Sequence, residues 1–125
     1  MTLGIGIDII EVARIAASLE KFGQRFGERI LLPDETMYCL SQKNPAPFVA
    51  ARFAAKEAVS KAFGTGIGAS LGWQDMEIRR RESGEPFVVL HGKGVDLFAA
   101  RGAARLLISL THTEHYAAAS AILEA

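Results

Sequence analysis

Hydrophobic and small or polar positions alternate strictly at the start of the chain, which predicts a strand from Leu3 to Ile10. One face of this strand carries the apolar residues Leu3, Ile5, Ile7 and Ile9. The opposite face carries Gly4, Gly6 and then Asp8. We expect the apolar face to meet the core. Because glycines weaken a strand, we expect another backbone or a ligand to approach the opposite face closely.

The pattern then changes to the helical spacing of three and four from about Ile10 to Phe26, and Gly27 is the expected end. The apolar stripe of this helix consists of Val12, Ile15, Leu19, Phe22 and Phe26. A short helix is predicted from Pro33 to about Ser41, with acids in its first turn. A longer one is predicted from roughly Pro47 to Phe63, since it is rich in Ala and Gly64 suits the position just past its end.

The second half of the chain is dominated by short apolar runs. Trp73 to Arg80 and Phe87 to Leu90 predict a strand hairpin, and Gly92 to Ala100 predicts a short helix. Leu106 to Thr111 has the composition of a strand. The segment from His115 to Leu123 is ambiguous: its alanines narrowly favour helix, but a hairpin with the preceding strand is the alternative.

Length and composition narrow the class of protein. With 125 residues, residues 1–125 are expected to form one compact domain, and half of them are hydrophobic, so some apolar surface is expected between subunits. The formal net charge is zero, which argues against a nucleic-acid or membrane-surface protein. A single cysteine, Cys39, excludes an internal disulfide and favours a reducing cytoplasmic setting. No basic leader with an apolar run and no membrane-length apolar stretch is visible.

Candidate chemistry lies on the longest predicted helix and beside it. Glu57 and Lys61 are four positions apart and therefore share one helix face, either as a simple exposed ion pair or as part of a site. Asp8 ends the glycine face of the first strand, where it is either a helix cap or an oxygen ligand for a divalent cation.

Three further features have both a structural and a functional interpretation. The cationic stripe Arg14, Ser18, Lys21 and Arg25 is either a solvated helix face or a docking surface for an acidic partner. Arg52 and Lys56 form a second cationic pair that is either solvated or in contact with phosphate. The run from Gly64 to Gly68 is not a Walker loop; it is either a helix stop followed by a flexible loop or, beside Glu57 and Lys61, a place where a phosphate-bearing ligand approaches the backbone.

Three segments together resemble one family: Gly4-Ile-Gly-Ile-Asp8, Phe53-Ala-Ala-Lys-Glu-Ala-Val-Ser-Lys61 with the glycine run after it, and Ser109-Leu-Thr-His-Thr113 with Tyr116-Ala117. In this order and spacing they are similar to holo-acyl-carrier-protein synthase, the small bacterial type of 4′-phosphopantetheinyl transferase. The resemblance covers essentially the whole chain and is weakest from Leu31 to Pro47. Thr111 stands where many family members carry serine.

The resemblance implies transfer of the phosphopantetheine arm from coenzyme A to a serine of apo acyl carrier protein, in fatty acid biosynthesis, with adenosine 3′,5′-bisphosphate released. Asp8 and Glu57 would hold Mg²⁺, with Mn²⁺ as an alternative, and Lys61 would meet the pyrophosphate. Either Glu57 or a metal-bound water would take the serine proton. Coenzyme A would contact Arg52, Thr111, His112 and the glycines Gly64 and Gly66. Arg14, Lys21 and Arg25 would dock the acidic carrier protein.

The implied fold is α+β, with an antiparallel sheet packed on a long central helix, a C-terminal strand, and a homotrimer with sites between subunits. Two other functions remain open. A Mg²⁺-dependent hydrolase of coenzyme A would need the same carboxylates but no basic stripe. A non-enzymatic module binding a carrier protein would need the stripe but neither Asp8 nor Glu57.

Overall fold

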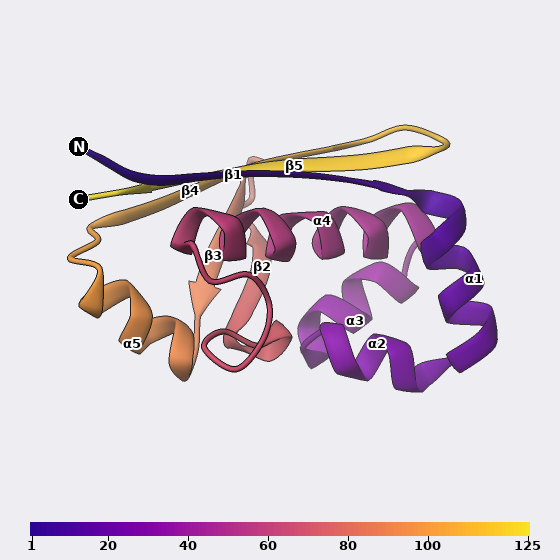
Figure 1. Cartoon of the computed structure of the whole chain (residues 1–125). Helices are drawn as coiled ribbons and strands as arrows, with labels where there is room; N and C mark the ends of the chain where they lie inside the picture. Colours follow the sequence, from indigo (N-terminus) through magenta and orange to yellow (C-terminus); the bar gives the residue numbers. More distant parts are fainter.

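A three-stranded antiparallel sheet lies along one side of the longest helix (Figure 1). The computed structural model describes residues 1–125 and places the strands β1 (Thr2–Glu11), β4 (Arg105–His112) and β5 (Tyr116–Glu124) in the order β1-β5-β4. β5 pairs with both neighbours, so β1 and β4 form opposite edges of the sheet. The predicted α+β class with antiparallel pairing is confirmed.

The helix α4 spans Ala46–Phe63, as its alanine-rich sequence predicts. Gly64 follows it with φ of 82°, in the left-handed region that a glycine enters without steric cost, and this ends the helix. α4 is buried on most of its surface, because the sheet covers one side and other elements cover the rest.

The glycine face of β1 makes the contact with α4. A Cβ atom built on Gly4 would lie 1.8 Å from the carbonyl oxygen of Ala62, and one on Gly6 would lie 1.8 Å from that of Ala58. The predicted close approach of another backbone is therefore confirmed. The expectation that the isoleucine face meets the core is wrong: Ile5, Ile7 and Ile9 are 73%, 70% and 66% exposed. The strand can approach the helix only where it lacks side chains, so the bulky face points away from α4.

The first helical region is divided in two. α1 spans Val12–Phe22 and α2 spans Gln24–Ile30, and Gly23 between them has φ of 58°. The prediction of one helix ending at Gly27 is wrong because Gly23 makes the turn and Gly27 lies inside α2. Of the predicted apolar stripe, Val12 and Ile15 are buried, whereas Phe22 is 53% exposed.

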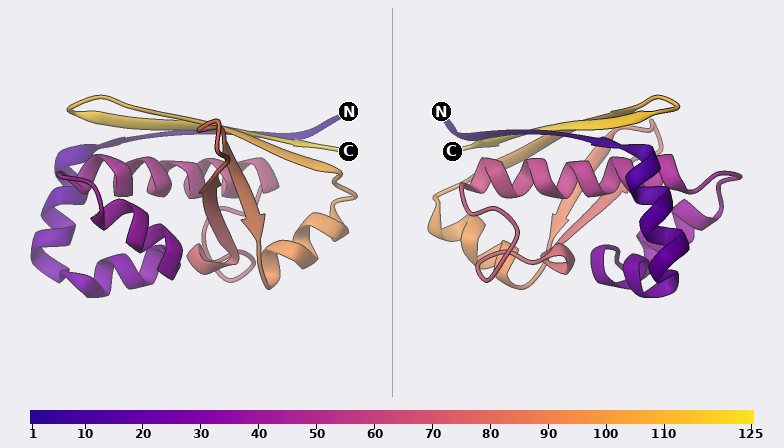
Figure 2. Two further views of the ribbon diagram at one scale, coloured as in Figure 1. Left: turned by 180° about the vertical axis from the view of Figure 1, so that it is seen from behind. Right: turned by 45° about the vertical axis from the view of Figure 1, so that its right-hand side comes forward.

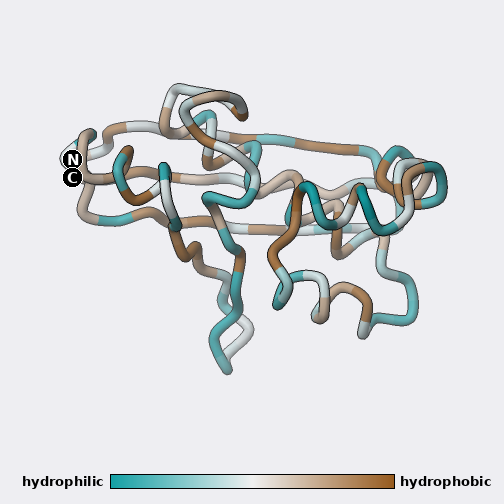
Figure 3. Tube along the Cα trace, turned by 90° about the horizontal axis from the view of Figure 1, so that it is seen from below, coloured by the Kyte–Doolittle hydropathy of each residue, from teal (hydrophilic) through white to brown (hydrophobic).

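The remaining elements lie on the other side of α4 (Figure 2). They are α3 (Pro33–Leu40), a 3₁₀ turn (Trp73–Asp75), β2 (Met76–Arg80), β3 (Pro86–Leu90) and α5 (Lys93–Ala100). β2 and β3 form the predicted hairpin, but β2 begins later than expected because the Asp75 carboxylate accepts a hydrogen bond from the Gly72 N–H and closes a turn. The polar tip of this hairpin reaches away from the rest of the chain (Figure 3). None of the helices has the length and apolar character needed to cross a membrane.

The C-terminal segment is a strand, which decides the ambiguity left by its composition. Ala117, Ala119 and Ala121 alternate along β5 and are buried. As the middle strand, β5 fills its backbone hydrogen bonds on both sides, and its small side chains allow α4 to pack closely. Helix propensity is a weak preference that such packing overrides.

A buried ion pair joins three elements beneath α4. The Lys56 ammonium lies 2.7 Å from a Glu35 carboxylate oxygen and donates to the Ile30 carbonyl at 2.6 Å. The other Glu35 oxygen accepts the N–H of Ile78 at 3.0 Å. Burial lowers the pKa of Lys56, although Glu35 opposes this effect. Lys56 therefore neither faces solvent nor awaits a phosphate; it connects α4 to α2, α3 and β2.

Candidate functional site

Asp8, Glu57 and Lys61 come together where β1 runs along α4. The Lys61 ammonium donates to the Ile7 carbonyl at 2.9 Å and to the Asp8 carboxylate at 3.2 Å. Asp8 faces the helix because it continues the glycine face of β1. It is not a helix cap: the residue before α1 is Glu11, and no side chain caps that helix. The close approach of strand and helix therefore brings these three side chains to one place.

The charges at this site do not balance. The two carboxylates of Asp8 and Glu57 face a single ammonium group, that of Lys61, whose side chain is 49% exposed. Partial burial raises the pKa of Glu57, the nearby charge of Asp8 raises it further, and Lys61 counteracts only part of this. The site thus has an excess of negative charge that a cation would neutralise.

The donor set limits which cation fits. No cluster of three or more histidine, cysteine or acidic side chains is present, so protein ligands would be the Asp8 and Glu57 carboxylates alone. Mg²⁺ commonly takes one or two carboxylates and fills its remaining positions with water and phosphate oxygens. Cys39 is not a candidate ligand, because it is buried and burial raises the pKa of its thiol to about 11.

A second group of predicted residues lies along the β4 side of α4. The Arg52 guanidinium lies 4.3 Å from the ring centre of Tyr38, and the rings of Phe48 and His112 are 5.0 Å apart in an edge contact. Arg52 is only 2% exposed, yet its Nε and Nη1 atoms have no hydrogen-bond partner. An unpaired buried donor is costly, and an anionic ligand arriving here would provide the missing acceptors.

These two groups are separate within one chain. Asp8 belongs to β1 and His112 to β4, at opposite edges of the sheet. Arg52 and Glu57 are five positions apart on α4, which places them about 140° apart around the helix axis. No hydrogen bond, ion pair or ring contact joins the two groups. One chain therefore does not bring all the predicted contacts to a single place.

Thr111 occupies a third position. It pairs with Ala118 of β5, and Ala118 pairs with Ile9 of β1. Directly paired residues share a face of the sheet, so Thr111 lies on the exposed face that Ile9 occupies, turned away from α4.

The glycine run begins at Gly64, directly after the last residue of α4 and three residues after Lys61. The N–H groups of Thr65 and Gly66 both donate to the Ser60 carbonyl, at 3.1 and 3.2 Å. Gly66 has φ of 66°, and a Cβ atom there would meet nothing within 4 Å. The loop therefore offers bare backbone next to open space. From the C-terminal end of α4 it runs along the side of the helix opposite to the sheet (Figure 1).

The predicted basic stripe is exposed but does not follow a single helix. Arg14 and Lys21 lie on α1, whereas Arg25 lies on α2 beyond the turn at Gly23. All three side chains are exposed.

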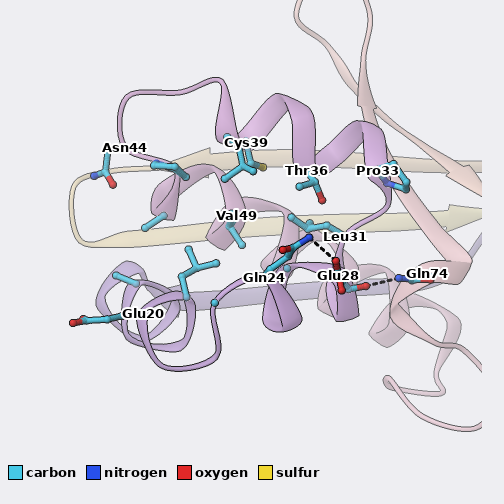
Figure 4. Close-up of a pocket in the computed structure, with 17 residues that line it drawn as sticks. Glu20, Gln24, Glu28, Leu31, Pro33, Thr36, Cys39, Asn44, Val49 and Gln74 are labelled. Carbon is cyan, nitrogen blue, oxygen red and sulfur yellow. Dashed lines mark hydrogen bonds between the residues drawn. The ribbon is translucent and has the colours of Figure 1, made fainter.

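A pocket of about 1100 Å³ lies between α1, α2, α3 and the start of α4 (Figure 4). Its wall includes Leu19, Leu31, Cys39 and Val49, and its polar residues include Glu20 and Glu28. Asp8, Glu57 and Lys61 do not line it, so the pocket is separate from the carboxylate site.

Sequence reasoning missed the aromatic partners of Arg52 and His112. Phe48 lies four positions before Arg52 on α4, so helical spacing alone could have associated the two. Tyr38 reaches them from α3, and no sequence signal indicates that contact.

Comparison with known proteins shows the family of this chain. The family model described as the 4′-phosphopantetheinyl transferase superfamily matches residues 4–120. The holo-[acyl-carrier-protein] synthase of Koribacter versatilis is 50% identical over 124 residues, which are 99% of each chain. The crystal structure of the Neisseria meningitidis holo-[acyl-carrier-protein] synthase superposes with a TM-score of 0.93 at 34% identity and covers 100% of both chains. The Helicobacter pylori enzyme in complex with coenzyme A gives a TM-score of 0.86 at 32% identity, covering 96% of this chain and 99% of its own.

Proposed function

The chain belongs to the 4′-phosphopantetheinyl transferase superfamily, and we propose that it acts as a holo-acyl-carrier-protein synthase. It transfers 4′-phosphopantetheine from coenzyme A to a serine of apo acyl carrier protein and releases adenosine 3′,5′-bisphosphate. The observation that carries this proposal is the convergence of Asp8, Glu57 and Lys61 on one spot between β1 and α4. Relatives at this level of identity bear the same name over the whole length, and a similar structure contains coenzyme A.

The reaction replaces a phosphoanhydride bond of coenzyme A by a phosphoester bond on the carrier protein. The serine oxygen of the carrier protein bonds to the phosphorus attached to pantetheine, and the bond from this phosphorus to the adenosine bisphosphate oxygen breaks. Lys61 neutralises negative charge that develops on the leaving phosphate. Glu57, or a water hydrogen-bonded to it, accepts the serine proton.

Asp8 and Glu57 would hold Mg²⁺, or Mn²⁺, because both ions suit carboxylate and water ligands. Such an ion supplies charge neutralisation and alignment of the pyrophosphate oxygens. Without it, the excess negative charge of the two carboxylates would repel the substrate.

We further propose that copies of the chain associate, as a homotrimer, and that neighbouring copies complete each site. Two observations support this. The isoleucine face of β1 continues across the sheet through Ile122 and Leu107, and all of these residues are exposed. In addition, Arg52 and His112 are separated from the carboxylates within one chain. A second copy would bring their coenzyme A contacts, and Thr111, to the Gly64–Gly66 loop of the first.

The acidic carrier protein would dock on Arg14, Lys21 and Arg25, which are exposed at one end of the molecule. Such charges mainly act on the rate and orientation of association. The pathway would be fatty acid biosynthesis, and a cytoplasmic setting remains the prediction.

The direct test is the intact mass of apo acyl carrier protein after incubation with the protein, coenzyme A and Mg²⁺. We expect a gain of one phosphopantetheine unit that is lost on chelation, and a rate at least about 100-fold lower in Glu57→Gln. Cleavage of coenzyme A without a change in the carrier protein, unaffected by charge reversal at Arg14 and Lys21, would favour a hydrolase. Carrier binding unchanged in Asp8→Asn and Glu57→Gln, with no chemistry at all, would favour a binding module.

The shared site has its own test. Glu57→Gln and His112→Ala are each expected to be inactive or nearly so as pure proteins. Mixing and reassembling them should restore part of the activity, since some sites would then combine two intact halves. Activity no greater than the sum of the separate variants would place both residues in the site of one chain.

A further inference from the structure

Arg101, directly after α5, joins two segments that are far apart in the sequence. Its Nη1 donates to the Phe63 carbonyl at 2.6 Å, and its Nη2 donates to the Leu3 carbonyl at 3.0 Å. Phe63 is the last residue of α4, where carbonyl groups have no partner within the helix. A cation at this end also interacts favourably with the helix dipole. The half-buried Arg101 thus fixes the end of α4 against the start of β1.

The other end of α5 holds the loop that follows α4. The Lys93 ammonium donates to the Ala69 carbonyl at 2.8 Å. The carboxylate of Asp75 accepts the Gly72 N–H at 2.8 Å and the Lys93 N–H at 3.3 Å. The segment 64–72 is therefore attached at its beginning through Phe63, in its middle at Ala69, and at its end at Gly72.

Between these attachments the loop is held mainly by backbone hydrogen bonds: the N–H groups of Thr65 and Gly66 donate to the Ser60 carbonyl, and that of Gly68 donates to the Leu71 carbonyl. A Cβ atom on Gly66 or Gly68 would have no atom within 4 Å, and one on Gly64 would meet only the Arg101 guanidinium, at 3.9 Å. Such a chain loses much conformational freedom when it binds a ligand. Attachments that already hold it in the free protein reduce that loss, which is the physical basis of preorganisation.

We propose that α5 braces the 64–72 loop for coenzyme A, and that Arg101 and Lys93 are positioning residues that act through this loop. The inference rests on the proposed function, because it takes the loop to contact coenzyme A. Neither side chain is required to touch the substrate. The brace affects binding of coenzyme A and leaves docking of the carrier protein unaffected, since the basic residues lie on α1 and α2 at the opposite end of α4 (Figure 1).

The test compares Arg101→Gln, Arg101→Lys and Lys93→Met with a matched control, Arg105→Gln. Arg105 is an exposed arginine on β4 that pairs with Glu124 and makes no hydrogen bond to the loop. Arg101→Gln should raise the KM for coenzyme A about 10-fold, with the KM for carrier protein and kcat changed less than about 2-fold. Lys93→Met should act in the same direction more weakly because Lys93 is exposed. Arg101→Lys should recover part of the loss, and Arg105→Gln should resemble the wild type.

Hydrogen exchange of residues 64–72 provides the second measurement. We expect faster exchange there in Arg101→Gln and Lys93→Met, and weaker protection by added coenzyme A than in the wild type. A lower unfolding temperature with unchanged KM for coenzyme A and unchanged loop exchange would show that Arg101 is only structural. Wild-type protein that binds coenzyme A at the loop but does not modify the carrier would overturn the proposed function and leave the brace standing.

Discussion

The contact between β1 and α4 gives the sharpest prediction, through the substitution Gly6→Ala. The added Cβ would lie 1.8 Å from the Ala58 carbonyl oxygen and 2.9 Å from the Ala62 nitrogen, whereas ordinary contacts begin near 3.4 Å. Both obstacles are backbone atoms of one helix, so no side chain can rotate away. The strand and helix would have to separate by more than an ångström.

The cost follows from what that separation exposes. Gaps of 0.5–1 Å already forfeit about a quarter to a half of the dispersion attraction between facing atoms. The affected surface includes the buried alanines of α4 and β5, which form much of the core. We expect Gly6→Ala to lower the free energy of unfolding by about 3 kcal/mol or more, at the upper end of overpacking effects. Displacement of β1 would also move Asp8 away from Glu57 and lower the transfer activity.

Urea unfolding followed by the fluorescence of Trp73, the single tryptophan, measures this at one fixed protein concentration. The matched control is Gly27→Ala, because Gly27 lies inside α2 and a Cβ there meets nothing within 4 Å. That substitution should stabilise the protein by roughly 0.5–1 kcal/mol. A Gly6→Ala protein within about 0.5 kcal/mol of the wild type would refute the reasoning.

Two further predictions concern charged residues. Lys56→Met should lower the free energy of unfolding by about 3–5 kcal/mol, because it leaves the Glu35 carboxylate buried without its partner. Adding Glu35→Gln should recover part of the lost stability. Equal stability of the single and double variants in urea would contradict this explanation. For Glu57, burial and Asp8 raise the folded-state pKa above the ordinary 4.5. The charged carboxylate therefore destabilises the metal-free fold at pH values above that raised pKa. This destabilisation disappears as the pH falls to 4.5. Glu57→Gln should therefore raise the unfolding temperature in chelator at pH 7 and not at pH 4.5. A variant less stable than the wild type at pH 7 would show that the charged Glu57 carboxylate does not destabilise the fold.

Local sequence signals predicted most elements because each has its own start or stop. The alanine run and Gly64 define α4, and the turn before Phe87 defines the β2–β3 hairpin. Two errors have physical causes that lie outside the local sequence. By residue type alone, Gly23 and Gly27 are equally good helix terminators. Only the tertiary path of the chain decides at which of them the helix ends. The isoleucines of β1 look like a core face because hydrophobicity does not reveal how closely a helix must approach.

The site was predictable to the extent that its residues lie on one strand and one helix. Asp8, Glu57 and Lys61 follow from the glycine face and from helical spacing. The burial of Arg52 and Lys56 could not be predicted, because their partners Tyr38 and Glu35 lie on α3, in the segment where the resemblance is weakest. Long cationic side chains look alike in a sequence whether they face water or a buried carboxylate.

The position of β5 in the middle of the sheet has a consequence for the order of folding. Thr2 pairs with Glu124, and Glu11 pairs with Tyr116, so the first strand finds its only strand partner in the last one. During synthesis β1 can at most rest its glycine face on α4, with its apolar isoleucines uncovered, until almost the whole described chain has emerged. Contacts of such long sequence separation slow folding and prolong the exposure of unpaired strand edges, which are prone to aggregation. The residues that form the carboxylate site are thus present early, but the sheet that holds Asp8 in register is completed last.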